Sequence, residues 1–393
     1  MQIEEHATGS IYRYLQGDKV IWAISIILSL ISILVVYSAT GNLAFRSADG
    51  DTEHFLIKHT FLIILGFVAM FFAHRIDYRF YSKLSRYALL ASIPLLIITW
   101  QFGSNINEAS RWIVIPFTSF SFQPSDFAKL ALISNVASML SKRQMRIRDD
   151  QRAINPMLIW SGIVCGLIGL TDWSSASILF LTILLLFFIG RVPVKYLGMM
   201  LVVGAMAGSF AFTFGQRKDT VSSRLSSFMN NKVSFQSEQA FLAVSTGGMF
   251  GKGSGNSAAK NFLPHPYSDF IFAIIVEEYG MFGAIVIIAA FLIILYRGML
   301  IVSNSQRAFG GLLAAGLTFS LVLQAFIHMG VVVGVLPITG LPLPLLSMGG
   351  TSLLFTGMSI GMLLSVSRTE ELGEDDSLRR NLKRRVISRN NAI

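Results

Sequence analysis

Charged side chains next to apolar segments are the first candidates for chemistry in this sequence. Asp126 and Lys129 are three residues apart at the start of one apolar run, and Arg111 and Trp112 lie shortly before it. Residues three apart share one face of a helix, so the carboxylate and the ammonium group can pair. A guanidinium and an ammonium group at the mouth of a membrane protein can also hold a lipid-linked phosphate. Two interpretations are therefore open: phosphate binding, or an ion pair that orients the helix, with Trp112 as an interfacial anchor.

A second group of acidic residues follows the glycine-rich segment GGMFGKGSG, whose glycines allow backbone amides to turn toward an anion. Asp269 follows Ser268 at the start of an apolar run, and Glu277 and Glu278 lie two turns further along. At 3.6 residues per turn, Glu277 is about 80° around the helix from Asp269, and Glu278 is nearly opposite. We expect both glutamates to bond inside a helix bundle. Asp269 is predicted at a helix N-terminus, where its carboxylate also favours the helix dipole.

Two further polar segments interrupt the apolar pattern. Asp172 lies in the turn LTDWSSAS, where the more economical interpretation is that its side chain caps the following amides. The segment VLPITGLPLPLLSMGGTSLLF holds too many prolines and glycines for a regular helix, so it predicts a structured loop that closes a cavity. Neither a phosphate-binding P-loop nor a metal cage is indicated, because Gly253 follows the Gly-Lys pair and no His/Cys/Asp/Glu spacing fits a metal.

The elements that must position these residues are membrane helices. Hydrophobic residues make up 53% of the chain and charged residues only 14%, whereas a soluble domain has about 25% charged residues. Apolar runs recur that are long enough to span a hydrocarbon core of roughly 30 Å. The sequence predicts an all-α, polytopic membrane protein of about ten transmembrane helices, near residues 20–38, 54–73, 87–101, 126–141, 156–171, 174–190, 196–214, 269–296, 308–333 and 350–366.

The basic residues predict the orientation of these helices. Lysine and arginine gather in alternate connections, such as HRIDYRFYSKLSR and SKRQMRIRDDQR, which the positive-inside rule assigns to the cytoplasm. Both termini are then cytoplasmic. The predicted parts are a cytoplasmic N-terminal segment (1–19), a transmembrane domain (20–366) with a large extracytoplasmic loop between helices seven and eight (215–268), and a basic cytoplasmic tail (367–393).

The overall charge and the single cysteine exclude other classes. The net charge of +10 is spread over short clusters, which favours contact with anionic lipid and argues against a nucleic-acid partner. Cys165 is the sole cysteine, so no intramolecular disulfide forms. The sequence has no internal repeat, which is the signature of many transporters.

Three long segments, in order, resemble the SEDS family (shape, elongation, division and sporulation), the polytopic proteins FtsW, RodA and SpoVE. RWI…FQPSDFAKLAL is similar to the family's RWI…FQPSE-x-AK. GGMFGKGSG…K…LP…SDFIFAIIVEEYG is similar to GG-x-x-G-x-G…K…LP…TDFIFA…EE-x-G, and GVLPITGLPLPLLSMGGTS to LP-x-TG-x-PLPF-x-SYGGSS. The resemblance extends from about Val35 to Leu364. The segment VYSATGNLAFR is closer to the cell-division type, FtsW, than to RodA.

The chain departs from the family pattern at several positions. Asp126 replaces a longer glutamate, which changes the reach to Lys129. TDWSSA replaces a PDFGTA-like turn, so a family role does not carry over to Asp172. Met348 stands in place of tyrosine and Leu345 in place of phenylalanine.

The resemblance implies a peptidoglycan glycosyltransferase that polymerises lipid II into glycan strands at the outer face of the bacterial cytoplasmic (inner) membrane, in cell division. It implies Asp269 as the general base, and as partners a class B penicillin-binding protein (a transpeptidase) with other divisome membrane proteins. The reaction needs a base at the acceptor hydroxyl and cationic groups for the leaving pyrophosphate. Candidates for the cationic groups that bind the pyrophosphate are Arg111, Lys129, Arg224 and Lys260. Supporting structural roles fall to Trp112, Asp126, Glu277 and Glu278. A divalent cation, magnesium or manganese, would be held by the pyrophosphate and not by a protein cage.

Two other functions stay open on the sequence. Glu277, Glu278 and Lys129 could line the path of a flippase or transporter for a lipid-linked precursor. The chain could also be a non-catalytic scaffold that recruits a transpeptidase. Small residues that permit close helix approach make the helices at 308–333 and 196–214 candidates for docking such a partner, or for packing within the bundle itself.

Overall fold

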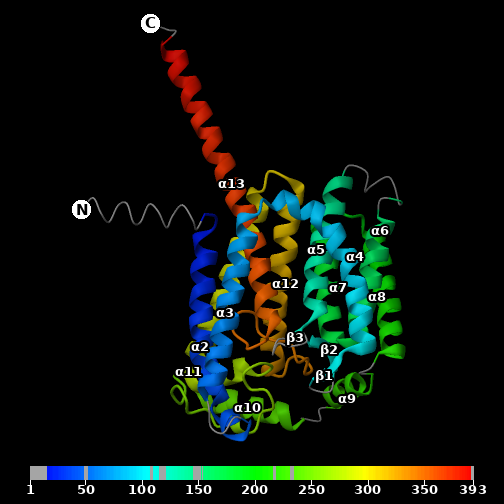
Figure 1. Cartoon of the computed structure of the whole chain (residues 1–393), viewed down its shortest axis with the longest axis vertical. Helices are drawn as coiled ribbons and strands as arrows, with labels where there is room; N and C mark the ends of the chain where they lie inside the picture. The colour runs from blue at the N-terminus through cyan, green and yellow to red at the C-terminus, as the bar shows by residue number, and fades with distance from the viewer. Residues whose placement is uncertain are drawn as a thin grey trace, which may run out of the picture.

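The protein folds, in a computed structural model, into one bundle of long helices with a cap of shorter elements at one end (Figure 1). Most of the predicted N-terminal segment, residues 1–15, lies outside the described residues. The structure describes residues 16–47, 52–106, 109–114, 121–144, 152, 154–215, 218–230 and 234–390.

Each of the ten predicted segments lies wholly or almost wholly within a helix of the structure. Six helices of the described chain, α2, α3, α4, α8, α11 and α12, are long and apolar enough to cross a membrane, and α6 and α7 are shorter apolar helices. α13 packs against α3, α4 against α5, and α11 against α12. The helices of the bundle are α2 (Lys19–Ser47), α3 (Thr52–Arg75), α4 (Tyr78–Phe102), α5 (Pro124–Arg143), α6 (Asn155–Thr171), α7 (Trp173–Ile189), α8 (Val194–Phe214), α11 (Ile271–Asn304), α12 (Ala308–Val332) and α13 (Thr351–Asn390).

Four predicted helix ends lie eight or more residues from those of the structure: α2 ends at Ser47 and α11 at Asn304, not at 38 and 296, and the other two concern α4 and α13. α4 starts at Tyr78, nine residues before the predicted start at residue 87, because its first turns are amphipathic. Tyr81 and Ser85 are buried there while Arg79, Lys83 and Arg86 are exposed, so mean hydropathy does not detect the helix. The apolar pattern ends the last helix at residue 366, but α13 continues to Asn390.

A small sheet accompanies the helices of this mostly helical chain. Three short antiparallel strands occupy the connection between α4 and α5, in the order β1-β2-β3. Ile113 of the central strand pairs with Phe122 of the third. β2 carries Arg111 and Trp112, so strand pairing sets the direction of both side chains. The strands are β1 (Ser104–Ile106), β2 (Ala109–Val114) and β3 (Ser121–Phe122).

The long segment between α8 and α11 holds three further helical elements. They lie with the strands at the end of the bundle opposite the last turns of α13 (Figure 1). This end therefore gathers all the connections on which the sequence placed candidate chemistry. The three elements are α9 (Lys218–Met229), α10 (Phe235–Gly247) and the 3-10 helix η2 (Ala259–Asn261).

The glycine-rich segment packs against α11 and does not turn its amides toward an anion. The backbone amides of Lys252 and Gly253 donate to the carbonyls of Glu277 (2.9 Å) and Glu278 (3.0 Å). At Gly280, inside α11, φ is +68°, a conformation that favours glycine. The amides of Lys252 and Gly253 therefore fix the segment to the helix and are not available for an anion.

The small residues of α12 pack inside the bundle. Gly311, Ala314 and Ala315 are buried, and a Cβ added at Gly316 would lie 2.6 Å from a methyl group of Ile133 on α5. Of the two alternatives for this helix, the structure supports packing within the bundle and not docking of a partner. α8 is different, because most of its apolar stretch is exposed.

Candidate active site

Arg111 and Asp172 form an ion pair between β2 and the start of α7. Asp172 is the N-cap of α7: it accepts from the amide of Ser175 (3.2 Å) and from its hydroxyl (2.9 Å). Its Oδ2 also lies 3.1 Å from Nη1 of Arg111, whose side chain is only 15% exposed. Asp172 is thus both the predicted cap and the partner of a cation 61 residues away in the chain.

Asp126 and Lys129 pair at the start of α5, as their spacing predicts. Lys129 Nζ lies 2.6 Å from Asp126 Oδ1, and both side chains are largely buried. The other carboxylate oxygen, Oδ2, is buried without a hydrogen-bond partner. Pro124 in the first turn suits a helix start, because it has no amide hydrogen to leave unsatisfied.

Arg224 reaches the same region from α9. Its Nη1 donates to the backbone carbonyl of Ile338, 3.1 Å away. Burial and the positive charge of Arg111 lower the pKa of the Arg224 guanidinium, whereas Asp269 and Asp172 act in the opposite direction. A guanidinium stays protonated in proteins nevertheless, so Arg224 adds a permanent positive charge near both carboxylates.

Asp269 lies just before α11, next to the loop between α12 and α13 (residues 333–350), which we call the proline-rich loop. Its Oδ1 accepts a hydrogen bond from the hydroxyl of Ser268 (3.0 Å). The hydroxyl of Ser347 donates to the carbonyl of Ser268 (2.7 Å), and the amide of Met348 donates to the carbonyl of Tyr267 (3.0 Å). A Cβ at Gly340 would lie 3.3 Å from Asp269 Oδ2, so this glycine lets the loop pass close to the carboxylate.

The proline-rich loop is non-helical, as predicted, and its carbonyls are bound by side chains from several helices. Besides the contact from Arg224, Ser174 of α7 donates to Thr339 O (3.1 Å). From α12, Gln324 donates to Pro342 O (2.8 Å), and Nδ1 of His328 lies 2.7 Å from Leu341 O. These bonds satisfy backbone groups that a helix would have paired internally, and they make the loop a rigid wall.

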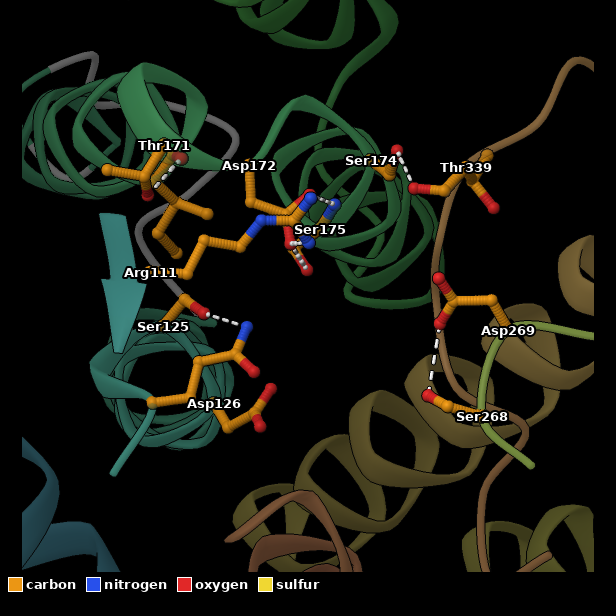
Figure 2. Close-up of polar contacts among 12 residues, drawn as sticks. Arg111, Ser125, Asp126, Thr171, Asp172, Ser174, Ser175, Ser268, Asp269 and Thr339 are labelled. Atoms are coloured by element: carbon orange, nitrogen blue, oxygen red, sulfur yellow. Dashed lines mark hydrogen bonds and ion pairs between the residues drawn. The ribbon is translucent and has the colours of Figure 1, made fainter. Parts of the chain in front are cut away.

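A cavity of about 390 Å³ lies between β2, the starts of α5 and α7, α9, the segment before α11 and the proline-rich loop. Figure 2 shows Asp269 on one side of the opening, with Asp126, Arg111 and Asp172 on the other. The cavity brings together six of the nine residues predicted for the site: Arg111, Trp112, Asp126, Lys129, Arg224 and Asp269.

Three predicted residues lie outside this cavity. Lys260 donates to the carbonyl of Gly255 (2.6 Å) on the exposed surface, so the structure does not support its assignment to phosphate binding. Glu277 accepts four hydrogen bonds, from Lys252 of the glycine-rich segment and from Ser257, Ala258 and Ala259 just after it. Glu278 accepts a hydrogen bond from Ser38 of α2. Glu278 thus bonds within the bundle, as expected, whereas Glu277 bonds to the connection that precedes α11.

Other lining residues were missed by the sequence prediction. Gln324 interrupts the apolar run of α12, so its polarity was a usable signal. Gln236, His265 and Ser175 lie in polar segments where nothing distinguishes them before folding. Among the described residues there is no group of three or more His, Cys, Asp or Glu side chains that could hold a metal ion.

Comparison with known proteins decides the family. The family model described as "FTSW_RODA_SPOVE: Cell cycle protein" matches residues 18–372. The chain belongs to the FtsW/RodA/SpoVE family. A family relative from Geobacter sp. (strain M18), named "Probable peptidoglycan glycosyltransferase FtsW", is 34% identical over 356 residues, which cover 89% of this chain and 96% of the relative.

Solved structures show the same fold. Rod shape determining protein RodA of Thermus thermophilus has a TM-score of 0.67 and 23% identity, covering 91% of this chain and 99% of that one. A chain from a solved structure described as "Structural coordination of polymerization and crosslinking by a peptidoglycan synthase complex" has a TM-score of 0.70 and 24% identity, with the same coverage. Family membership and the apolar helices make this FtsW/RodA/SpoVE protein a multi-pass protein of the bacterial cytoplasmic membrane.

Proposed function

We propose that this chain is a peptidoglycan glycosyltransferase that polymerises lipid II into glycan strands during cell division. The observation that carries the proposal is the cavity that the carboxylate of Asp269 lines together with three cationic side chains, Arg111, Lys129 and Arg224. A base opposite a cationic surface is what transfer of a sugar from a pyrophosphate requires. The name of the Geobacter relative agrees with this chemistry.

The proposed topology puts this chemistry outside the cytoplasm. It has ten transmembrane helices, with α5 and α13 added to the apolar ones, and both termini in the cytoplasm. Basic residues such as Arg143, Arg191 and Arg307 lie at connections on the same side as the last turns of α13, as the positive-inside rule requires. The cavity and the α8–α11 segment are then extracytoplasmic, where α9 and α10 form the large loop.

In the proposed reaction, Asp269 takes the proton from a sugar hydroxyl of the acceptor. The hydroxyl oxygen then bonds to C1 of the donor sugar, on the face opposite the leaving group. The bond from C1 to the pyrophosphate oxygen breaks, and undecaprenyl pyrophosphate leaves with the electron pair, so the configuration at C1 is inverted. Arg111, Lys129 and Arg224 stabilise the charge that develops on the pyrophosphate.

The charge balance of the cavity supports a divalent cation as part of the substrate complex. The three cations are matched by three carboxylates, those of Asp126, Asp172 and Asp269, so the lining alone has no excess of positive charge for a pyrophosphate. Magnesium or manganese bound to the pyrophosphate would supply it, neutralising the leaving group. Asp126, whose Oδ2 has no hydrogen-bond partner, is the carboxylate suited to approach such an ion.

The proposed partners are a class B penicillin-binding protein, which would cross-link the new strand, and other membrane proteins of the divisome. The solved structure with a TM-score of 0.70 is of a peptidoglycan synthase complex that coordinates polymerisation and crosslinking, which supports this proposal. A partner helix in the membrane would need an exposed surface, so α8 is better suited than α12.

Purified protein in detergent, given lipid II and magnesium, tests the proposed function. We expect glycan strands on a gel, in the absence of any membrane potential or second compartment. Lysozyme digestion of the product and an inactive Asp269→Asn protein are the controls. If the well-folded parent protein forms no strands but moves lipid II between the leaflets of reconstituted vesicles, it is instead a flippase. If it neither forms strands nor moves lipid II, the remaining function is that of a non-catalytic scaffold.

A further inference from the structure

A second, larger hollow opens beside the candidate active-site cavity. Its volume is about 1,090 Å³, and its walls are α9, α10, the end of α12 and the segments 261–264 and 336–338. We call it the α9–α10 groove. It adjoins the active-site cavity, because the two share the lining residues Arg224, Gln236, Pro264 and Ile338.

The walls of the groove are anchored to the rest of the bundle. Arg224 ties α9 to the proline-rich loop through its bond to Ile338 O. Phe241 of α10 packs on Gly334 at the end of α12, where φ is +80° and an added Cβ would lie 2.6 Å from the phenylalanine ring. The groove is thus formed before any ligand binds, which lowers the entropic cost of binding.

The lining of the groove combines aromatic faces with many small polar groups. Phe228 is 42% exposed, and Phe235 and Phe262 are each 57% exposed. Side chains with hydroxyl and amide groups surround them: Thr220, Ser223, Ser227, Ser234, Gln236, Ser237 and Asn261.

The groove carries fewer charges than the active-site cavity. Among the described residues its charged lining consists of Asp219 and Arg224, whereas three cationic side chains and three carboxylates line the cavity. The hydroxyl-rich lining does not match a lipid chain, which gains nothing from polar groups. An uncharged polyhydroxylated ligand fits better, because its hydroxyls can bond to the serines while its ring faces stack on phenylalanine.

We propose that the α9–α10 groove binds the saccharide part of the glycan strand that the neighbouring site extends. This inference rests on the proposed function and deepens it by assigning a subsite: the pyrophosphate occupies the cavity with the cations, and the sugars beyond the reacting residue lie along the groove. A strand held in this way stays bound between additions, so the groove sets product length.

The double variant Phe228→Ala/Phe235→Ala tests the proposal, because it removes two exposed rings while leaving Phe241 in place. Phe250→Ala is the matched control: its ring is 86% exposed, on the glycine-rich segment, and does not line the groove. The first measurement is binding of an N-acetylglucosamine tetrasaccharide to detergent-purified protein, by isothermal titration. We expect roughly two- to tenfold weaker binding for the double variant and parental binding for the control.

The second measurement is the length of the strands formed from lipid II. The double variant should still form glycosidic bonds but release shorter strands than the parent and the control. Ser227→Trp, which fills the groove, should also release shorter strands. It tests the proposal if the double variant does not fold.

The proposal is overturned if the folded variants bind the tetrasaccharide and form strands as the parent does. It is also overturned if the variants lose only co-purification with a transpeptidase, because the groove would then be a protein interface. Because tetrasaccharide binding needs no turnover, it tests the groove even if the Asp269→Asn result refutes the proposed function.

Discussion

Glutamine in place of Glu277 is expected to loosen the segment of residues 252–259, which this side chain holds against α11. The carboxylate is 1% exposed. Oε1 accepts from Lys252 Nζ (2.6 Å) and the amide of Ala258 (3.1 Å), and Oε2 accepts from Ser257 Oγ (2.5 Å) and the amide of Ala259 (3.1 Å). Both oxygens must therefore accept, which a carboxylate can do and an amide cannot.

The size of the effect follows from these contacts. In either orientation of the glutamine, its NH2 group faces a backbone amide that loses its acceptor. A buried donor left unsatisfied costs about 1–3 kcal/mol. The lost ion pair adds about 1 kcal/mol at most, because the Lys252 side chain is 34% exposed and partly screened. Glu277→Gln should thus destabilise the segment by about 2–4 kcal/mol.

Hydrogen exchange of the Ala258 and Ala259 amides in detergent measures this change directly. A local loss of about 2 kcal/mol makes exchange roughly thirtyfold faster. Glu278→Gln is the matched control, since Glu278 is equally buried but accepts one hydrogen bond, from Ser38, and its Oε2 has no partner. A glutamine keeps that one contact, so exchange at both alanines should stay parental.

Unchanged exchange in Glu277→Gln would refute this reasoning. Equal acceleration in the two variants would also refute it, because the effect would then come from charge removal at the α11 backbone and not from the four hydrogen bonds.

Three further predictions concern the proposed reaction. Asp269→Asn should lower the turnover of lipid II by about 10²–10⁴-fold, the usual contribution of a general base, with unchanged thermal unfolding; strands formed at near the parental rate would exclude Asp269 as the base. Lys129→Met alone should destabilise the protein by about 3 kcal/mol, because it leaves a buried carboxylate without its partner. The double variant Asp126→Asn/Lys129→Met should recover unfolding stability but not polymerisation; recovery of both would make the pair purely structural. Deletion from Asp375 onward should leave polymerisation in detergent unchanged, since the tail lies at the opposite end of the bundle; loss of activity in a folded protein would show that the two ends are coupled.

Much of the site could be predicted where one short segment contains the whole interaction. Asp126 and Lys129 pair because helical spacing alone brings them together. The turn at Asp172 caps α7, because a short side chain at a helix start reaches the nearby amides. The loop after α12 is non-helical because prolines cannot continue a helix.

Contacts between distant segments could not be predicted in the same way. Arg111 and Asp172 are 61 residues apart, and no pattern around either one names the other. Lys260 was a candidate for binding the pyrophosphate, but it bonds locally on the surface. The strands between α4 and α5 are too short to have a clear periodicity of their own, and only their mutual pairing forms the sheet.

Apolar length and the distribution of lysine and arginine act segment by segment, so they predict a bundle of membrane helices with polar connections without knowledge of the neighbours. Which polar groups share one cavity depends on the folded arrangement: Asp269 before α11, Arg111 on β2 and Lys129 on α5 line it together because these elements meet at one end of the bundle. The packing of the glycine-rich segment on α11 and the groove beside the cavity likewise follow from the fold. Those outcomes depend on the relative positions of several helices, which hydropathy and local hydrogen bonding do not specify.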